Sequence, residues 1–279
     1  MTRGRVVPFL LLGPAAVWNL VFFIATVGVM VARSVYRGGV VSLAHYHDLF
    51  VNPLYLTVML TTFQISVLVT AASLGLGYPV AYLLATSGSR IRAAVLLLVV
   101  LPYWLDYIVR SYSWMVLLGR MGLVNRTLME WGLVTEPLPI LYTRWSVLIG
   151  MVQILLPLTV LTLYGAMLRI DQGLIQAAAA HGARPWQSFR KVFFPLSLPG
   201  VYGAGLLTFV TSLGFYITPA LLGGRKDTMI SQLIVTVSSD MLDWALASAV
   251  SVVLLLASLA ILVVYNRFFS IDRLWGGSA

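Results

Sequence analysis

The chain has 279 residues, of which 60% are hydrophobic and 10% are charged, and its formal net charge is +9. Soluble domains carry about 25% charged residues, so this composition excludes an ordinary soluble domain and indicates lipid as the surrounding solvent. The absence of cysteine excludes disulfides, cysteine-ligated zinc, iron–sulfur clusters and a thiol nucleophile. The positive charge does not indicate nucleic acid, because the basic residues lie at the ends of apolar segments, where they set topology and contact headgroups.

Six apolar segments are long enough to cross a membrane, which takes about 20 residues for about 30 Å of hydrocarbon. They cover residues 8–32, 54–85, 93–118, 146–168, 199–222 and 244–265. The first resembles a signal peptide, but it exceeds the roughly 7–15 residues of a signal core and lacks a cleavage site, so we expect it to be retained. The sequence predicts an all-α polytopic membrane protein in which residues 1–279 form one transmembrane domain.

An even number of spans places both termini on the same side of the membrane. The short loops that join spans on that side carry Arg90, Arg92, Arg184, Arg190 and Lys191, and such basic loops indicate the cytoplasm. We therefore expect a multi-pass protein of the inner membrane with cytoplasmic termini. On the other side, residues 33–53 and 119–144 are polar enough to form small structured caps.

The third segment contains two charged residues, Asp106 and Arg110. A charge at the bilayer centre costs about 2.5–3.5 kcal/mol on insertion scales, and residues four apart share a helix face. Two interpretations stay open: a structural ion pair that faces neighbouring helices, or an Asp106 that faces the solute pathway while Arg110 sets its charge state.

Aromatic residues crowd the same segment, among them Tyr103, Tyr107 and Trp114, together with Trp104 and Tyr112. Aromatic faces attract ammonium groups, but interfacial belts and helix packing use the same residues. Both interpretations stay open. His45 and His47 do not predict a metal site, because residues two apart do not share a helix face and further ligands are missing nearby.

The stretch between the fourth and fifth spans, residues 169–198, has the sequence pattern of two short helices around a turn. Asp171 suits an N-cap before an alanine run, and Gly182 suits a helix C-terminus. Pro185 can begin a second helix at its first turn. Trp186, Phe189 and Val192 would give that second helix an apolar face. Small alanines at the tip let the groove of another protein close tightly around them.

This stretch resembles the signature loop of permease subunits in binding-protein-dependent ABC importers, whose pattern is Glu-Ala-Ala, three residues, Gly, nine residues, Ile-x-Leu-Pro. Ala177, Ala178, Gly182 and Pro195 match at the same spacing. The chain departs from the pattern at three positions, with Gln176 for Glu, Val192 for Ile and Phe194 for Leu. The loss of the glutamate charge puts in doubt any ion pair that the family makes there.

Further stretches look like the spermidine/putrescine-type permeases, in particular Leu101-Pro-Tyr-Trp, Arg110-Ser-Tyr-Ser-Trp, Gly122-Leu-Val-Asn and Ile217-Thr-Pro-Ala-Leu-Leu-Gly-Gly. The resemblance implies a type I ABC importer permease fold and a coupling helix that docks on an ATPase. The residues implied in coupling are Gln176, Ala177, Ala178, His181, Gly182 and Ala183. The candidate solute pathway comprises Asp106, Tyr103, Tyr107, Arg110 and Trp114.

The resemblance also implies the partners: a second homologous permease, two copies of an ABC ATPase and an extracytoplasmic solute-binding protein. Neither lysine follows a glycine, so the chain lacks the Gly-Lys of a P-loop. We expect no catalysis and no bound cofactor in this chain, with ATP and magnesium bound by the ATPase. A polyamine such as spermidine or putrescine is the expected solute. The alternatives are another small organic solute or ion and, from a different class, a self-sufficient secondary transporter, which would show inverted repeats.

Overall fold

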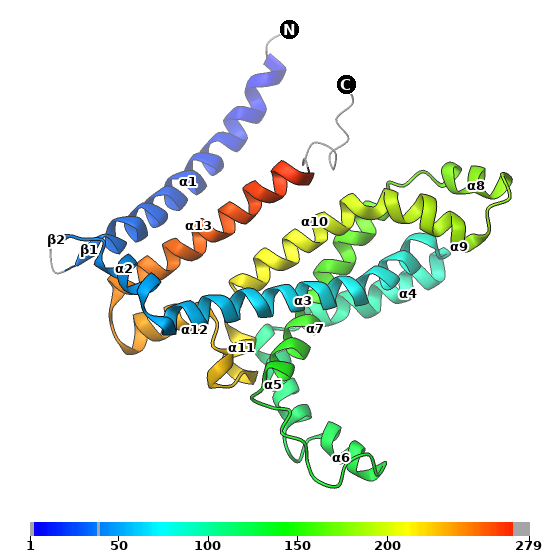
Figure 1. Ribbon diagram of the computed structural model, residues 1–279. Coiled ribbons are helices and arrows are strands. Elements are labelled where there is room, and N and C mark those ends of the chain that lie inside the picture. The colour runs from blue at the N-terminus through cyan, green and yellow to red at the C-terminus, as the bar shows by residue number, and fades with distance from the viewer. Residues whose placement is uncertain (1–2, 38–39, 270–279) are drawn as a thin grey trace. The chain divides into compact units, whose positions relative to one another are not determined.

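The computed structural model describes residues 3–37 and 40–269, and most of them are helical (Figure 1). Five helices are long and apolar enough to cross a membrane, and a bent pair of helices supplies a sixth candidate span. The five long helices are α1 (Arg3–Ser34), α3 (Pro53–Thr86), α7 (Arg144–Met167), α10 (Phe194–Leu213) and α13 (Trp244–Phe269). The predicted all-α membrane fold is therefore confirmed for the described residues.

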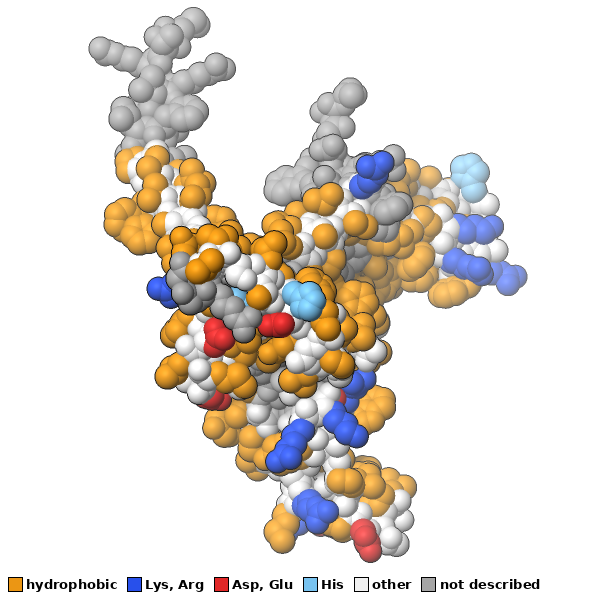
Figure 2. Space-filling view, turned by 60° about the vertical axis from the view of Figure 1, so that its left-hand side comes forward, with side chains coloured by type: hydrophobic (Ala, Val, Ile, Leu, Met, Phe, Trp, Pro, Cys, Tyr) orange, Lys and Arg blue, Asp and Glu red, His pale blue; other side chains and the backbone are white. Residues whose placement is uncertain are grey.

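Contacts divide the chain into two compact units. The first contains residues 1–56 and 233–257, and the second contains residues 57–232 and 258–279. Figure 2 shows one face, on which hydrophobic side chains cover most of the visible surface and charged side chains gather in small groups. Such a surface is suited to lipid or to partner helices rather than to water.

The first unit contains α1, a short hairpin and a short helix. In the hairpin, β1 (Tyr36–Arg37) pairs antiparallel with β2 (Val40–Val41). Helix α2 (Ala44–Val51) buries Leu49 fully, and the Tyr46 hydroxyl donates a hydrogen bond to Ser34 Oγ over 2.7 Å. The predicted cap at 33–53 is thus a folded element fastened to the end of α1. The unit also holds η4 (Thr236–Asp240), after which α13 begins.

The second unit holds most of the buried side chains. Its shorter elements are α4 (Ser89–Val100), η1 (Leu101–Trp104), α5 (Tyr107–Leu118), α6 (Leu123–Glu130), α8 (Gln172–Ala180), α9 (Pro185–Ser188), η2 (Phe189–Phe193), α11 (Ile217–Leu222), η3 (Arg225–Asp227) and the first half of α12 (Ile230–Val235).

Helices α7 and α10 form the centre of this unit through small and hydroxyl residues. A Cβ atom added at Gly200 would lie only 2.4 Å from the Cβ of Ala166, so glycine is needed for the two helices to approach. The hydroxyls of Thr159 and Thr208 lie 2.8 Å apart, and both residues are fully buried. Apolar side chains of α3, α7, η2 and α10, including Leu163 and Phe193, form the larger buried cluster of this unit.

The cap between α5 and α7 is organised by one buried amide. Asn125 is fully buried. Its Nδ2 donates to the carbonyl oxygens of Gly119 and Leu138 over 3.1 and 3.0 Å, and its Oδ1 accepts from the Leu138 amide over 2.9 Å. These bonds hold both ends of residues 119–138 together, as expected for a structured cap.

The third predicted span, residues 93–118, is interrupted near Pro102 rather than formed by one helix. The chain forms α4, the 3₁₀ turn η1 and α5, and the two sides of this break are bent by 97°. Pro102 lies at the start of η1, and Leu105 and Asp106 have extended backbone before α5 begins. Proline weakens a helix interior, and an aspartate before a helix favours a new N-terminus.

The fifth predicted span also ends earlier than expected. Helix α10 ends at Leu213, with Gly214 as its C-cap, and residues 217–222 form the separate helix α11. The apolar composition of 199–222 conceals this break, because hydropathy does not register the glycine at which the helix stops.

Candidate functional site

The stretch between α7 and α10 has the predicted helix–turn–helix form. The Asp171 side chain accepts a hydrogen bond from the Gly173 amide over 2.8 Å and caps α8. Gly182 has φ +79°, the left-handed conformation that favours glycine at a helix C-terminus. The alanines of α8 are exposed or half-buried, so the helix offers a smooth surface of small side chains.

The remaining candidate coupling residues surround this turn. Nδ1 of His181 lies 2.8 Å from the Ala177 carbonyl oxygen, so the imidazole folds back over the C-terminal end of α8. Gln176 is exposed and Ala183 is half-buried. All of the candidate coupling residues therefore lie on or next to α8 and its turn, in one continuous stretch of chain.

A ladder of aromatic rings connects the turn to the helix core. Pro185 starts α9, and the Arg184 amide donates to Gln187 Oε1 over 2.9 Å. Trp186 stacks on Phe189 with ring centroids 5.5 Å apart, and Phe189 meets Tyr82 of α3 at 5.2 Å. These ring contacts pack α9 and η2 against α3.

The most deeply buried side chain of this stretch lies one residue beyond the predicted apolar face of Trp186, Phe189 and Val192. The side chain that is fully enclosed is Phe193, at 2% exposure, while Val192 is half-buried. Residues 189–193 form a π-helical turn, and its wider register moves the buried position one residue further along the chain. A simple three-residue repeat does not detect this shift.

Asp106 lies at the break of the third segment rather than within a continuous helix. Its Oδ1 accepts a hydrogen bond from the Ile108 amide over 2.7 Å and caps α5. The residue is exposed. The carboxylate is thus occupied by a helix N-terminus on one side and open on the other, and the residues described show it in no ion pair with Arg110.

Arg110 is enclosed, with 4% exposure. Within the described residues, its three guanidinium nitrogens have no hydrogen-bond partner. Its Cζ lies 5.2 Å from the centre of the Tyr107 ring, which makes a cation–π contact with the guanidinium. The geometry separates the two charges: the carboxylate is exposed and the guanidinium is hidden.

The aromatic residues of the candidate pathway also differ in their exposure. Tyr103 is 45% exposed and Tyr107 is 42% exposed, while Trp114 is half-buried. The Tyr107 ring contacts the ring of Phe215 at 5.8 Å, just before α11. Helix α11 is further held to α5 by the Ser111 and Thr218 hydroxyls, which lie 3.0 Å apart. Tyr103, Asp106 and Tyr107 are therefore the exposed members of this set.

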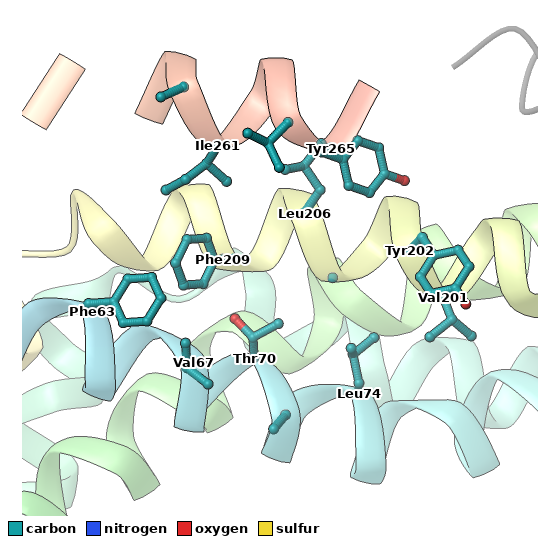
Figure 3. Close-up of a pocket in the computed structure, with 14 residues that line it drawn as sticks. Phe63, Val67, Thr70, Leu74, Val201, Tyr202, Leu206, Phe209, Ile261 and Tyr265 are labelled. Carbon is teal, nitrogen blue, oxygen red and sulfur yellow. The ribbon is translucent and has the colours of Figure 1, made fainter. Parts of the chain in front are cut away.

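A separate pocket of about 710 Å³ lies between α3, α10 and α13 (Figure 3). Residues such as Phe63, Val67, Leu206 and Ile261 line it, and none of its lining residues carries a charge. The pocket contains no member of the candidate pathway, and its lining is almost entirely apolar.

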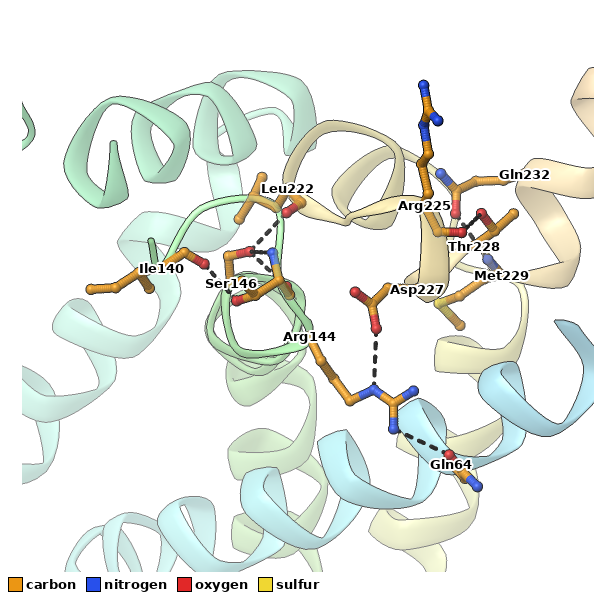
Figure 4. A network of polar contacts seen from close by, with 11 residues as sticks. Gln64, Ile140, Arg144, Ser146, Leu222, Arg225, Asp227, Thr228, Met229 and Gln232 are labelled. Atoms are coloured by element: carbon orange, nitrogen blue, oxygen red, sulfur yellow. Dashed lines mark hydrogen bonds and ion pairs between the residues drawn. The ribbon is translucent and has the colours of Figure 1, made fainter. Parts of the chain in front are cut away.

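The sequence analysis missed a polar cluster formed by Gln64, Arg144 and Asp227 (Figure 4). Arg144 Nε donates to Asp227 Oδ1 over 3.1 Å, and one terminal guanidinium nitrogen donates to Gln64 Oε1 over 3.2 Å. In the sequence, Arg144 lies 83 positions from Asp227 and 80 positions from Gln64. No local pattern could have joined them, because only the fold brings α3, α7 and η3 together.

Comparisons with known proteins agree with this geometry. The family described as "Binding-protein-dependent transport system inner membrane component" matches residues 26–271. The chain is 34% identical to the spermidine/putrescine transport system permease protein PotB of Haemophilus influenzae, over 81% of this chain and 79% of that protein. It is 33% identical to PotB of Escherichia coli, over 77% and 78% of the two chains.

Two solved structures have the same fold. A bacterial alginate ABC transporter, in complex with an alginate pentasaccharide-bound periplasmic protein, matches with TM-score 0.78 and 19% identity over 99% of this chain and 97% of that one. The methionine ABC transporter MetNI matches with TM-score 0.59 and 19% identity over 78% and 97%. At these identities the likeness shows a shared architecture.

Proposed function

Since the chain belongs to the family of binding-protein-dependent transport system inner membrane components, we propose that it forms half of the translocation pathway of an ATP-driven polyamine importer. The observation that carries the coupling role is the exposed α8, capped by Asp171 and ended by Gly182 in a left-handed turn. Its small side chains would let the groove of an ATPase close around it.

The polyamine assignment draws on the two PotB relatives and on the exposed side of the broken span. Asp106 offers an exposed carboxylate that forms no hydrogen bond with Arg110, and Tyr103 and Tyr107 are exposed near it in the sequence. An ammonium group binds favourably both to a carboxylate and to an aromatic face. A flexible chain with several ammonium groups matches these partners.

In this proposal the chain itself is non-catalytic. A second, homologous permease supplies the other half of the pathway, two ATPase copies bind ATP and magnesium, and an extracytoplasmic binding protein delivers the solute. Both termini lie in the cytoplasm, so that α8 faces the ATPase. Closure of the ATPase dimer then moves α8, and the aromatic ladder through Phe189 and Tyr82 transmits this motion to the spans.

The proposal is tested by reconstituting the chain with its partner permease, ATPase and binding protein in liposomes. ATP hydrolysis and uptake are measured with spermidine, putrescine, an amino acid and an oxyanion, and the control omits the binding protein. We expect the polyamines alone to stimulate both activities. Stimulation by a different solute would replace the polyamine assignment, and a chain that binds no ATPase would overturn the importer function.

A further inference from the structure

The Gln64–Arg144–Asp227 cluster joins three elements at the start of α7 (Figure 4). Asp227 is the last residue of η3, and its side chain is only 9% exposed, whereas the Arg144 side chain is 40% exposed. A carboxylate at this depth needs a partner, because an unpaired buried charge is strongly unfavourable. Arg144 supplies it through a direct ion pair of 3.1 Å.

The ion pair fixes the end of a tightly packed segment, residues 214–227. Within this segment, the Leu222 carbonyl oxygen accepts a hydrogen bond from Ser146 Oγ over 2.7 Å. A Cβ atom added at Gly224 would lie 2.4 Å from the Tyr142 carbonyl oxygen, and one added at Gly150 would lie 2.7 Å from Thr218 Cγ2. The segment therefore lies directly against the first turns of α7. The ion pair between Arg144 and Asp227 holds its C-terminal end.

The opposite end of the same segment contacts the candidate pathway. Phe215 meets the ring of Tyr107, and Thr218 meets Ser111 on α5. The segment thus runs from the ion pair to the wall that carries Asp106 and Tyr107. A shift at Asp227 would be transmitted through α11 to these side chains, because tightly packed elements do not deform continuously.

We propose that Arg144 and Asp227 are positioning residues for transport: their ion pair holds residues 214–227 so that Phe215 and Thr218 set the place of α5 in the pathway. The role of α5 in the pathway rests on the proposed function. The link from the Arg144–Asp227 ion pair to α5 rests only on the contacts described above. Gln64 adds a neutral hydrogen bond from α3 to the same guanidinium.

The mechanical link is tested without any solute. The chain has no cysteine, so Ser111→Cys and Thr218→Cys introduce one pair whose side-chain oxygens lie 3.0 Å apart in the parent. We expect rapid disulfide formation between them in the assembled importer, and about fivefold slower formation when Arg144→Gln or Asp227→Asn is added. An unchanged rate in both variants would overturn the proposal.

The transport role is tested in the same complexes, without the cysteines. We expect Arg144→Gln and Asp227→Asn each to raise the half-saturating solute concentration about tenfold while the amount of assembled complex stays the same. The exchanged pair Arg144→Asp with Asp227→Arg should recover most of the loss. The matched control is Arg225→Gln, which removes a neighbouring exposed arginine of η3 and should change neither readout.

Uptake that falls only in proportion to assembled complex, with unchanged half-saturation, would assign the pair a purely structural role and overturn the proposal. A failure of the polyamine assignment is distinguishable from this, because then the parent importer ignores polyamines while the cross-linking rates still report whether the ion pair positions α5.

Discussion

Two regions of this chain break a helix and restart it, and they do so with the same chemistry. In the α8–α9 stretch, Asp171 caps α8 through the Gly173 amide at 2.8 Å. In the third segment, Asp106 caps α5 through the Ile108 amide at 2.7 Å. The first restart follows the turn Leu168-Arg169-Ile170, while the second lies within a run of apolar residues.

The surroundings of the two caps differ in a way that suits two different tasks. Helix α8 buries no residue and exposes its alanines, which leaves its surface open to a partner. Helix α5 encloses Arg110 and packs against α11 and α7, so that it exposes Asp106 at a fixed place. In the proposed function, helix capping thus places an element that docks on the ATPase in one region and a wall of the solute pathway in the other.

The largest expected effect comes from Gly182→Val, which disrupts the turn that ends α8. Gly182 has φ +79°, and a β-branched residue is strongly disfavoured there. We expect solute-stimulated ATP hydrolysis of the reconstituted importer to fall by about tenfold or more. Assembly of the complex is measured in parallel by size-exclusion chromatography.

The matched control for this variant is Gly88→Val. Gly88 has φ −65° and no atom within 4 Å of an added Cβ, so its stimulated hydrolysis should stay near that of the parent. Normal stimulation in Gly182→Val would contradict the coupling role of α8.

The same comparison explains which features could be predicted from the sequence. The α8–α9 stretch could be predicted because Asp171, Gly182 and Pro185 each determine the conformation of adjacent residues. The structure places all three as expected, as the N-cap of α8, the left-handed turn and the start of α9. A bend near Pro102 could be predicted, because proline weakens a helix interior. The restart of the helix at Asp106 could not, because hydropathy does not reveal the backbone angles that make a residue an N-cap. The contact of Arg144 with Asp227 was also beyond reach, since it depends on the packing of distant segments.

Variants of Asp106 distinguish its role as the N-cap of α5 from the role of its negative charge. Asparagine caps a helix as well as aspartate does, whereas alanine loses about 1 kcal/mol. We expect Asp106→Asn to weaken polyamine uptake with little change in thermal stability, and Asp106→Ala to lower both. Uptake by Asp106→Asn equal to that of the parent would restrict Asp106 to its capping role.

Arg110→Met tests whether the enclosed guanidinium is unpaired. An uncompensated buried charge is destabilising, and the lost Tyr107 contact offsets only part of the gain. We expect the variant to unfold at an equal or higher temperature in detergent, with a gain of about 1 kcal/mol. A clear fall in the unfolding midpoint would show that Arg110 is stabilised by a partner in the assembled protein.

The smallest expected effect comes from Asp171→Ala, which removes the cap of α8 but leaves its turn. The lost hydrogen bond costs about 1 kcal/mol at an exposed helix end, and contact with an ATPase would restore part of the order. We expect stimulated hydrolysis to fall by about twofold, with Asp171→Asn close to the parent. A loss as large as that of Gly182→Val would mean that the cap, rather than the turn, dominates coupling.

The central claim, that α8 docks on an ATPase, is tested most directly by cross-linking from a single cysteine in this cysteine-free chain. Ala179→Cys carries a short photoreactive cross-linker in the assembled importer, and Arg120→Cys, in the stretch between α5 and α6, serves as the control. The account predicts a cross-link from position 179 to the ATPase subunit and none from position 120. Absence of the ATPase cross-link from position 179 in an intact complex would contradict it.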